Sequence, residues 1–159
     1  MATYRKYGYS YGPKVIQTAK VSDEGAITEG DIVVLDAVDA VSGASGAGYI
    51  KSWSAASDPV VGVALEDASA PSADGDVSIQ IVLALPGTVF CFKDASVTYA
   101  YRYQCCDIGA AQTIDFDADT YQNVWIVDVD TENDLIYVMF KGPFKAADGV
   151  SSTIDYGSS

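Results

Sequence analysis

Apolar and polar residues alternate most clearly in the middle of the chain. Every second position of one stretch is apolar: Val77, Ile79, Ile81, Leu83 and Leu85. A period of two residues is typical of a β-strand with one buried face. Pro86-Gly87 follows and suits the centre of a type II turn, since proline presets the first φ and glycine accepts the positive second one. Residues 60–92 therefore predict a central meander in which residues 88–92 form the return strand.

Shorter apolar segments on both sides predict more strands, and no helix longer than two or three turns. The predicted strands cover residues 15–19, 32–35, 49–54, 99–103, 124–129 and 135–140. The last two form a hairpin around the turn residues 131–134. Turns or loops are expected at 22–25, 41–48, 55–58 and 109–119. The predicted fold class is all-β, a small β-barrel or sandwich with an additional C-terminal hairpin region.

The first fourteen residues differ from the rest and predict an extended interaction arm. Tyr7, Tyr9 and Tyr11 alternate with small residues, so an extended chain places three rings on one face. Tyrosine beside arginine and lysine is typical of protein interfaces. The alternative, an edge strand on the chain's own sheet, stays open. Residues 15–143 are the predicted body, 98–143 are a possible subdomain, and residues 144–159 are a predicted flexible tail.

Charge is distributed unevenly and narrows the range of partners. The formal net charge is −13, yet the first twenty residues contain Arg5, Lys6, Lys14 and Lys20 and no acidic residue. The remaining five basic residues face 22 acidic ones, a net charge of −17. A body this negative repels nucleic acid and anionic membranes. No apolar run is long enough to span a membrane, and the N-terminus lacks a secretory h-region, so we expect synthesis in the cytoplasm.

The composition leaves little catalytic chemistry. The chain contains no histidine, which excludes Ser-His-Asp and Cys-His catalysis and histidine-based zinc sites. Cys91, Cys105 and Cys106 are expected to be buried free thiols, with a vicinal Cys105–Cys106 bridge as the alternative. A pair of carboxylates acting as a glycosidase is the one enzymatic mechanism left open. We therefore expect a protein that is not an enzyme and has no cofactor.

Two acidic stretches invite comparison with calcium sites. They are DFDAD, at residues 115–119, and DVDTEND, at residues 128–134. Calcium favours several carboxylate oxygens in a flexible loop, but neither stretch has the central glycine and terminal glutamate of an EF-hand. Solvated turns and strand edges explain both stretches, and no metal site is predicted.

Several segments follow the order found in the head decoration (cement) proteins of tailed phages. They are EGDIVVLDA, a Gly/Ser loop, YIKSW, DPVVGVALEDAS, a short acidic loop and DVSIQIVLALPGTV. In that family a Gly-Asp unit leads into a strand, a Val-Gly-Val-Ala strand follows, and a later strand ends in a glycine turn. The chain resembles this family over residues 15–92, in the order and spacing of segments rather than in any catalytic signature.

The resemblance implies a small β-barrel called a β-tulip, assembled as a homotrimer on the outer surface of a virion. The implied function is a structural one, in which the protein binds the major capsid protein of its parent virus and cements neighbouring capsomers. An N-terminal arm in that family commonly adds a strand to the shell protein. The residues expected to contact the shell or a neighbouring subunit are Tyr4, Arg5, Lys6, Tyr7, Tyr9, Tyr11 and Lys14.

A carbohydrate- or receptor-binding β-module, displayed on a particle surface, is the alternative function. It depends on the rings that alternate in residues 99–103, Tyr99, Tyr101 and Tyr103, and on Trp53. These rings would have to lie exposed in one patch to form a sugar-binding platform. A cross-strand aromatic ladder packed on the fold is the other interpretation of the same pattern.

Overall fold

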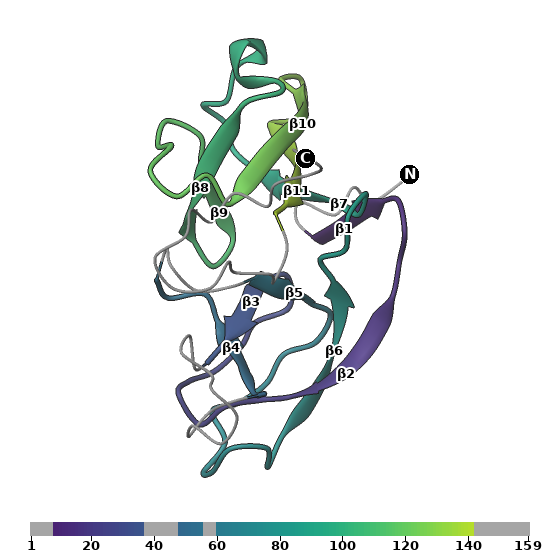
Figure 1. Cartoon of the computed structure of the whole chain (residues 1–159), viewed down its shortest axis with the longest axis vertical. Coiled ribbons are helices and arrows are strands. Elements are labelled where there is room, and N and C mark those ends of the chain that lie inside the picture. Colours follow the sequence, from purple (N-terminus) through teal and green to yellow (C-terminus); the bar gives the residue numbers. More distant parts are fainter. Residues whose placement is uncertain (1–7, 37–47, 56–59, 142–159) are drawn as a thin grey trace, which may run out of the picture.

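The computed structural model describes residues 8–36, 48–55 and 60–141, and over these residues the protein is all-β. Eleven strands form two antiparallel sheets, and one short 3₁₀ helix, η1 (Tyr99–Tyr101), lies at one end (Figure 1). The predicted all-β fold class is therefore confirmed, and its architecture is a pair of β-sheets. In the described part of the chain, no helix is long and apolar enough to cross a membrane.

The six-stranded sheet contains the first described strand and the C-terminal half of the chain. Its strands, in spatial order, are β1 (Gly8–Tyr11), β7 (Val89–Lys93), β11 (Leu135–Phe140), β10 (Val124–Asp130), β8 (Cys105–Ala110) and β9 (Thr113–Asp115). The predicted hairpin at 124–140 is confirmed as β10 and β11, in which Asp130 pairs with Leu135 next to the turn. Asp134 closes this turn with a φ of 57°.

The five-stranded sheet contains most of the N-terminal half. Its strands, in spatial order, are β2 (Ile16–Lys20), β6 (Ser78–Leu83), β5 (Val60–Ala64), β3 (Ile32–Leu35) and β4 (Ile50–Ser52). Each of these strands coincides with a predicted one. A single parallel bridge between Val21 and Ile50 brings the end of β2 to β4, so the sheet curls strongly.

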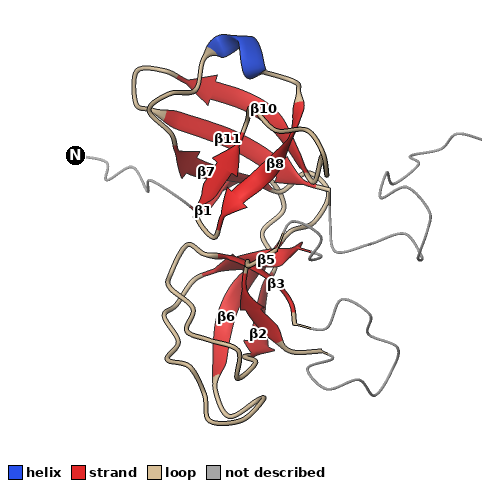
Figure 2. Cartoon of the chain, turned by 90° about the vertical axis from the view of Figure 1, so that its left-hand side faces the viewer, coloured by secondary structure: helices blue, strands red, loops and turns tan. Residues whose placement is uncertain are grey.

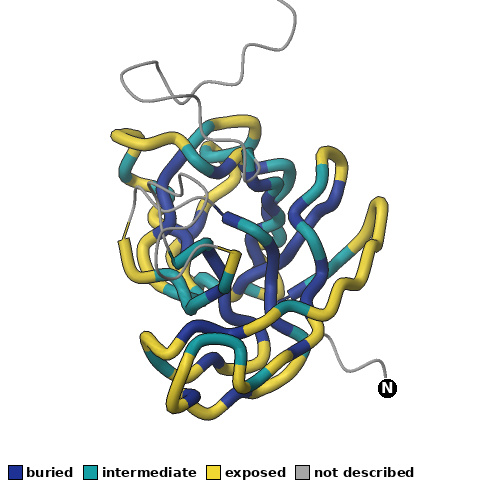
Figure 3. Tube along the Cα trace, turned by 60° about the horizontal axis from the view of Figure 1, so that its bottom comes forward, coloured by how far each residue is buried: buried dark blue, intermediate teal, exposed yellow. Residues whose placement is uncertain are grey.

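The main hydrophobic core lies where the two sheets meet. Phe90, Phe92 and Ile126 of the six-stranded sheet join Ile32 and Val63 of the five-stranded sheet in one buried cluster. Figure 2 shows the sheets as two stacked lobes, and Figure 3 shows the buried segments running through the interior. One face of each sheet is therefore excluded from water by the other sheet.

A second core covers the far face of the five-stranded sheet. It contains Val33, Ile79 and Ile81 from the strands, and Val21 and Ile27 from the segment that follows β2. Consecutive residues of β3 therefore point into different cores, and all of Ile32, Val33 and Val34 are fully buried. This explains why β3 reads as an unbroken apolar run, since a strand buried on both faces has no polar alternation.

The predicted central meander is wrong at its last strand. The turn itself is confirmed, because Gly87 has a φ of +87° and Thr88 N donates to Leu85 O at 3.0 Å. The strand after the turn, β7, does not return along β6, and pairs with β1 and β11 in the other sheet. The first four residues of β7 are all buried, and an apolar run of this kind predicts a strand without specifying its neighbour.

Residues 99–119 also differ from the prediction. The first three residues of the expected aromatic strand at 99–103 form the helix η1, which ends at the extended Arg102, and Tyr103 follows in a left-handed conformation with φ 66°. The expected polar connection at 109–119 instead contains the end of β8 and all of β9. Ile114 of β9 is buried in the main core and Phe116 packs against it, but two large apolar residues in a polar stretch are too weak a signal to predict a strand.

Candidate binding surfaces

Residues 8–11 of the predicted arm form a strand of the protein's own sheet. β1 pairs with β7 as the edge of the six-stranded sheet, with Gly8 opposite Cys91 and Tyr9 opposite Phe90. The Tyr9 ring packs against the main core, and its hydroxyl donates to Gly12 O at 2.8 Å. For residues 8–11 the alternative, an edge strand on the chain's own sheet, is therefore the one observed, and Tyr9 completes the core at this edge.

The predicted contact residues are separated by this arrangement. A register shift between Tyr9 and Tyr11 interrupts the alternation, and Tyr11 is 48% exposed. Lys14 places its Nζ 4.8 Å from the centre of the Tyr9 ring, a cation–π contact. Tyr4, Arg5, Lys6 and Tyr7 lie outside the described residues. The structure thus brings Tyr9 and Lys14 together, whereas Tyr11 lies apart from them on the surface.

Both sheets present an edge strand along the same side of the molecule. β1 is an edge of the six-stranded sheet and β2 is an edge of the five-stranded sheet, and they are consecutive in the chain (Figure 1). We call residues 8–20 the edge flank. Val15 and Ile16 are 44% and 48% exposed there, and the flank carries Lys14 and Lys20 without an acidic residue. An exposed edge with apolar side chains is a template for pairing with another chain.

A cluster around Arg102 was not predicted from the sequence. Its guanidinium lies 4.8 Å from the Tyr99 ring centre and 4.7 Å from the Tyr103 ring centre. Its two terminal nitrogens donate to the Tyr99 and Tyr103 hydroxyls at 3.0 and 2.7 Å. Arg102 Nε lies 3.1 Å from Asp128 Oδ1, an ion pair in which Nε makes no hydrogen bond. The cluster holds η1 against β10.

The four rings of the predicted sugar platform are not in one patch. Tyr99 and Tyr103 are 59% and 62% exposed beside Arg102. Tyr101 instead packs on Phe116, with ring centres 4.6 Å apart, and donates to Asp117 Oδ1 at 2.5 Å. That hydrogen bond is the main reason why the pKa of Tyr101 is raised. Trp53 follows β4 in the other sheet, where its backbone N donates to Ile32 O.

A cleft lies on the outer face of the six-stranded sheet, beside the β10–β11 turn. Its volume is about 420 Å³, and its lining residues are Tyr11, Tyr99, Asp128, Val129, Asp130, Thr131, Glu132 and Tyr137. We call it the tyrosine cleft. Asp128 is paired with Tyr137, and Tyr137 with Cys91, so these side chains share one face of the sheet. Three rings and three carboxylates from four separate parts of the chain meet here.

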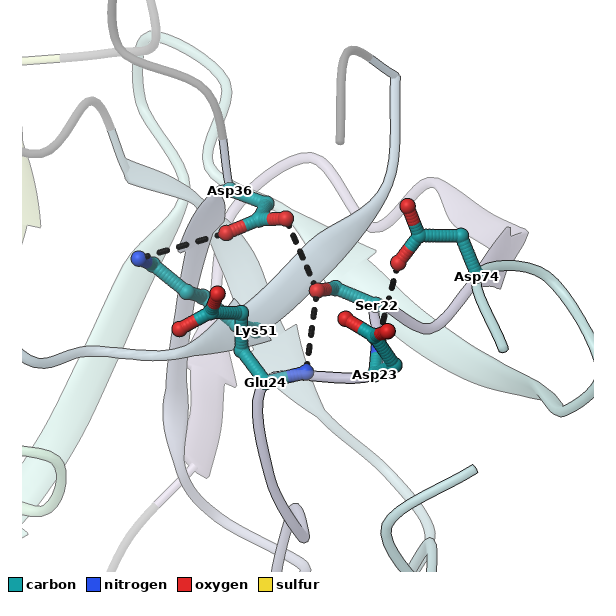
Figure 4. A network of polar contacts seen from close by, with 6 residues as sticks. All are labelled: Ser22, Asp23, Glu24, Asp36, Lys51 and Asp74. Atoms are coloured by element: carbon teal, nitrogen blue, oxygen red, sulfur yellow. Dashed lines mark hydrogen bonds and ion pairs between the residues drawn. The ribbon is translucent and has the colours of Figure 1, made fainter. Parts of the chain in front are cut away.

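The acidic side chains of the five-stranded sheet have structural partners. Buried Ser22 donates its hydroxyl to Asp36 Oδ2 at 2.8 Å, and Lys51 Nζ lies 3.3 Å from Asp36 Oδ1 (Figure 4). The backbone N of Asp23 donates to Asp74 Oδ1 at 2.9 Å. These contacts tie the turn after β2 to β3, β4 and the loop before β6, so they stabilise the fold.

Acidic side chains of the six-stranded sheet also stabilise its turns. Buried Asp107 accepts hydrogen bonds from the backbone N–H groups of residues 120, 121 and 122, at 2.7 to 3.1 Å. Asp130 accepts from Glu132 N and from both nitrogens of Asn133, and these bonds lower its pKa. Among the described residues, no group of three or more metal-ligating side chains could hold a metal ion.

The three cysteines are thiols rather than halves of a disulfide, and two of them are buried as predicted. Cys91 and Cys106 are buried and Cys105 is partly buried. Burial raises the pKa of the Cys106 thiol to about 12, with the neighbouring charges of Asp107, Cys105 and Asp115 adding to the effect. A thiol protonated near neutral pH is a poor nucleophile, so Cys106 is a core side chain.

The chain was compared with known proteins in three ways. A scan against protein-family models, a search of curated proteins and a search of solved structures each found no match.

Proposed function

We propose that this protein is a non-enzymatic structural protein that binds the outer surface of a tailed-phage capsid through its edge flank. The observation that carries the proposal is the flank itself, residues 8–20. It offers the edges of two sheets side by side, exposed apolar side chains, and positive charge on an otherwise acidic protein. Strand addition at such an edge gives affinity through main-chain hydrogen bonds.

The stretch that resembles cement proteins supports the proposal. Residues 15–85 supply every strand of the five-stranded sheet, and β7 then leaves for the other sheet. A resemblance in the order of segments gains weight when those segments form one sheet. In this proposal the curled five-stranded sheet corresponds to the β-tulip, and residues 98–143 are an elaboration that forms most of the second sheet.

Charge favours an acidic partner surface next to the flank. Lys14 and Lys20 are exposed on it, and the flank contains no carboxylate. The preceding residues, Tyr4 to Tyr7, add two more positive charges in sequence. The rest of the protein is acidic, which steers the flank rather than the body toward a negative shell and keeps decorated particles apart. A homotrimer at a symmetric capsid site would add avidity to each contact.

Co-sedimentation with undecorated capsids of the parent virus tests the proposal. The full chain is expected to pellet with the capsids, and a double Val15→Ser/Ile16→Ser variant is expected to lose most of this binding. Tyr121→Ser is the matched control, because Tyr121 is 48% exposed on a loop far along the chain from the flank. Failure of the full chain to pellet would overturn the proposal. Equal binding by the Val15→Ser/Ile16→Ser variant and the Tyr121→Ser control would show that the capsid contact lies outside the flank.

A deletion of residues 2–7 separates two versions of the contact. If these residues add to the shell protein, their deletion reduces capsid binding while the flank variants retain part of it. If β2 is the strand that pairs with the shell, the deletion has little effect and the Val15/Ile16 variant has a large one. Both outcomes keep the capsid function and assign the residues that perform it.

A further inference from the structure

We propose that the tyrosine cleft binds the guanidinium group of an arginine side chain on a partner protein. The cleft is lined by rings from β1, η1 and β11, and by carboxylates from β10 and the following turn. The cleft is open to solvent, and its volume of about 420 Å³ leaves room for the end of one side chain. The inference does not depend on the capsid proposal: Tyr11 belongs to both the edge flank and the cleft, but the other lining residues lie outside residues 8–20, and a synthetic peptide can test the cleft without capsids.

Charge complementarity selects a cation. The lining contains Asp128, Asp130 and Glu132 and no basic side chain. Arg102 at the rim neutralises at most one of these carboxylates, through its ion pair with Asp128. The hydrogen bonds from Asn133 lower the pKa of Asp130, so this carboxylate stays ionised over the physiological range. The cleft therefore keeps a net negative charge that favours a positively charged occupant.

The rings add the second requirement of a cation site. Burial is the main cause of the raised pKa of Tyr137, and the nearby acidic groups add to it, so this phenol stays neutral. A neutral phenol presents an electron-rich ring face, which attracts a cation within about 6 Å of the ring centre. Tyr11 and Tyr99 are about half exposed or more, which leaves ring surface accessible on two sides of the cleft.

Arg102 shows that this part of the protein already holds a guanidinium in this way. It lies between the Tyr99 and Tyr103 rings, donates to both hydroxyls and approaches one carboxylate. Tyr99 also lines the cleft, so a second guanidinium would meet the same kinds of group. Arginine fits better than lysine, because its planar fork stacks on rings and donates in several directions at once.

Titration with blocked tripeptides, followed by the backbone amide signals in NMR spectra, tests the inference on the full chain. The probes are Gly-Arg-Gly, Gly-Lys-Gly and Gly-Gln-Gly, with maltotriose and chitotriose as neutral sugars. The arginine peptide is expected to shift the amides of Thr131, Glu132 and Tyr137, the lysine peptide to do so more weakly, and the other probes to leave them unchanged. Raising the salt concentration should weaken the arginine shifts.

Two variants and one control assign the binding to the cleft. Glu132→Gln removes an exposed charge, and Tyr137→Leu removes a ring, and each is expected to weaken arginine-peptide binding about threefold or more. Asp23→Asn is the matched control, since it removes one exposed charge beside the other sheet, and it should leave the affinity unchanged. The inference is overturned if the arginine peptide shifts none of these amides, if the glutamine peptide shifts them equally, or if a sugar binds there instead.

Discussion

The α-carbon of Gly12 lies directly against the carbonyl of Gly87. A Cβ on Gly12 would sit 2.1 Å from Gly87 O, and Gly12 has a φ of +94°. Gly12 begins the connection from β1 to β2, and Gly87 lies in the turn from β6 to β7. The β1–β2 and β6–β7 connections, which both pass from one sheet to the other, therefore lie against each other. Thr88 Oγ1 links them by donating to Pro13 O at 2.6 Å.

The first prediction concerns this close approach. Gly12→Ala should lower the free energy of unfolding by about 2 kcal/mol or more, because the new methyl meets a backbone carbonyl and the positive φ disfavours alanine. Gly8→Ala is the matched control, since Gly8 also has a positive φ, +105°, but open space where its Cβ would be. Urea denaturation should show a clearly larger loss for Gly12→Ala. Equal losses would mean that backbone strain alone matters here.

The second prediction concerns the hydrogen bond from Thr88. This side chain is fully buried, so Thr88→Val keeps its shape and leaves the Pro13 carbonyl without that donor. We expect the free energy of unfolding to fall by about 1 kcal/mol. Thr88→Ser keeps the hydroxyl and loses a methyl, so it should keep the hydrogen bond to Pro13 O. Amide exchange in residues 12–16 should then be as slow as in the wild type, and slower than in Thr88→Val. A Thr88→Val protein as stable as the wild type would contradict the role of this bond.

The third prediction concerns alkaline pH. The folded-state pKa of Cys106 is raised from 9.0 to about 12, mainly by burial. Below pH 9 the thiol is protonated in both states, so its contribution to stability is fully present. Between pH 9 and 12 only the unfolded state ionises, and stability is lost at up to about 1.4 kcal/mol per pH unit.

The Cys106→Ala variant isolates this effect from the titration of tyrosines and lysines. Its overall stability should be lower, because it leaves a small cavity in the main core, but its stability should fall less steeply above pH 9. The measurement is the difference between the two denaturation curves at several pH values. If that difference does not change between pH 8 and pH 11, Cys106 does not titrate as its burial requires.

The fourth prediction concerns the Arg102 cluster. Arg102→Lys should loosen η1, because an ammonium cannot stack between Tyr99 and Tyr103 and donate to both hydroxyls. We expect a weaker near-ultraviolet circular dichroism signal from tyrosine and a stability loss of about 1 kcal/mol. The pairing with Asp128 should contribute less than about 1 kcal/mol in a double-mutant cycle, since both side chains are partly exposed. A larger coupling energy that persists in high salt would show that the Arg102–Asp128 pair is shielded from water, contrary to this prediction.

The sequence predicted strands better than it predicted their partners. The segments at 15–19, 32–35, 60–64, 78–83 and 124–140 lie close to their observed bounds, because each carries local alternation or a β-branched run. The partner of β7 depends on tertiary packing of Phe90 and Phe92, for which alternation contains no information. The helix η1 was missed because its alternating tyrosines imitate a strand, while its stability comes from Arg102 and Asp128.

The candidate sites show the same limit. The tyrosines of residues 7–11 indicated a contact surface, but only the fold shows that Tyr9 serves the protein's own core and that Tyr11 turns to the cleft. Tyr137 alone is a weak indication of a binding site, because a tyrosine at a partly exposed position of a strand is common. The meeting of Tyr11, Tyr99 and Tyr137 depends on two strands and a helix that lie 38 or more residues apart in sequence, so no local pattern could reveal it.

Hydrogen–deuterium exchange of the free protein and of the capsid-bound protein tests the edge flank most directly. Capsid binding is expected to slow exchange at backbone amides of Ile16–Lys20, which form an edge strand in the free protein. The buried strands β7 and β11 should exchange equally slowly in both samples. Unchanged exchange throughout residues 8–20, with new protection on another face, would contradict the claim that the flank is the surface that docks.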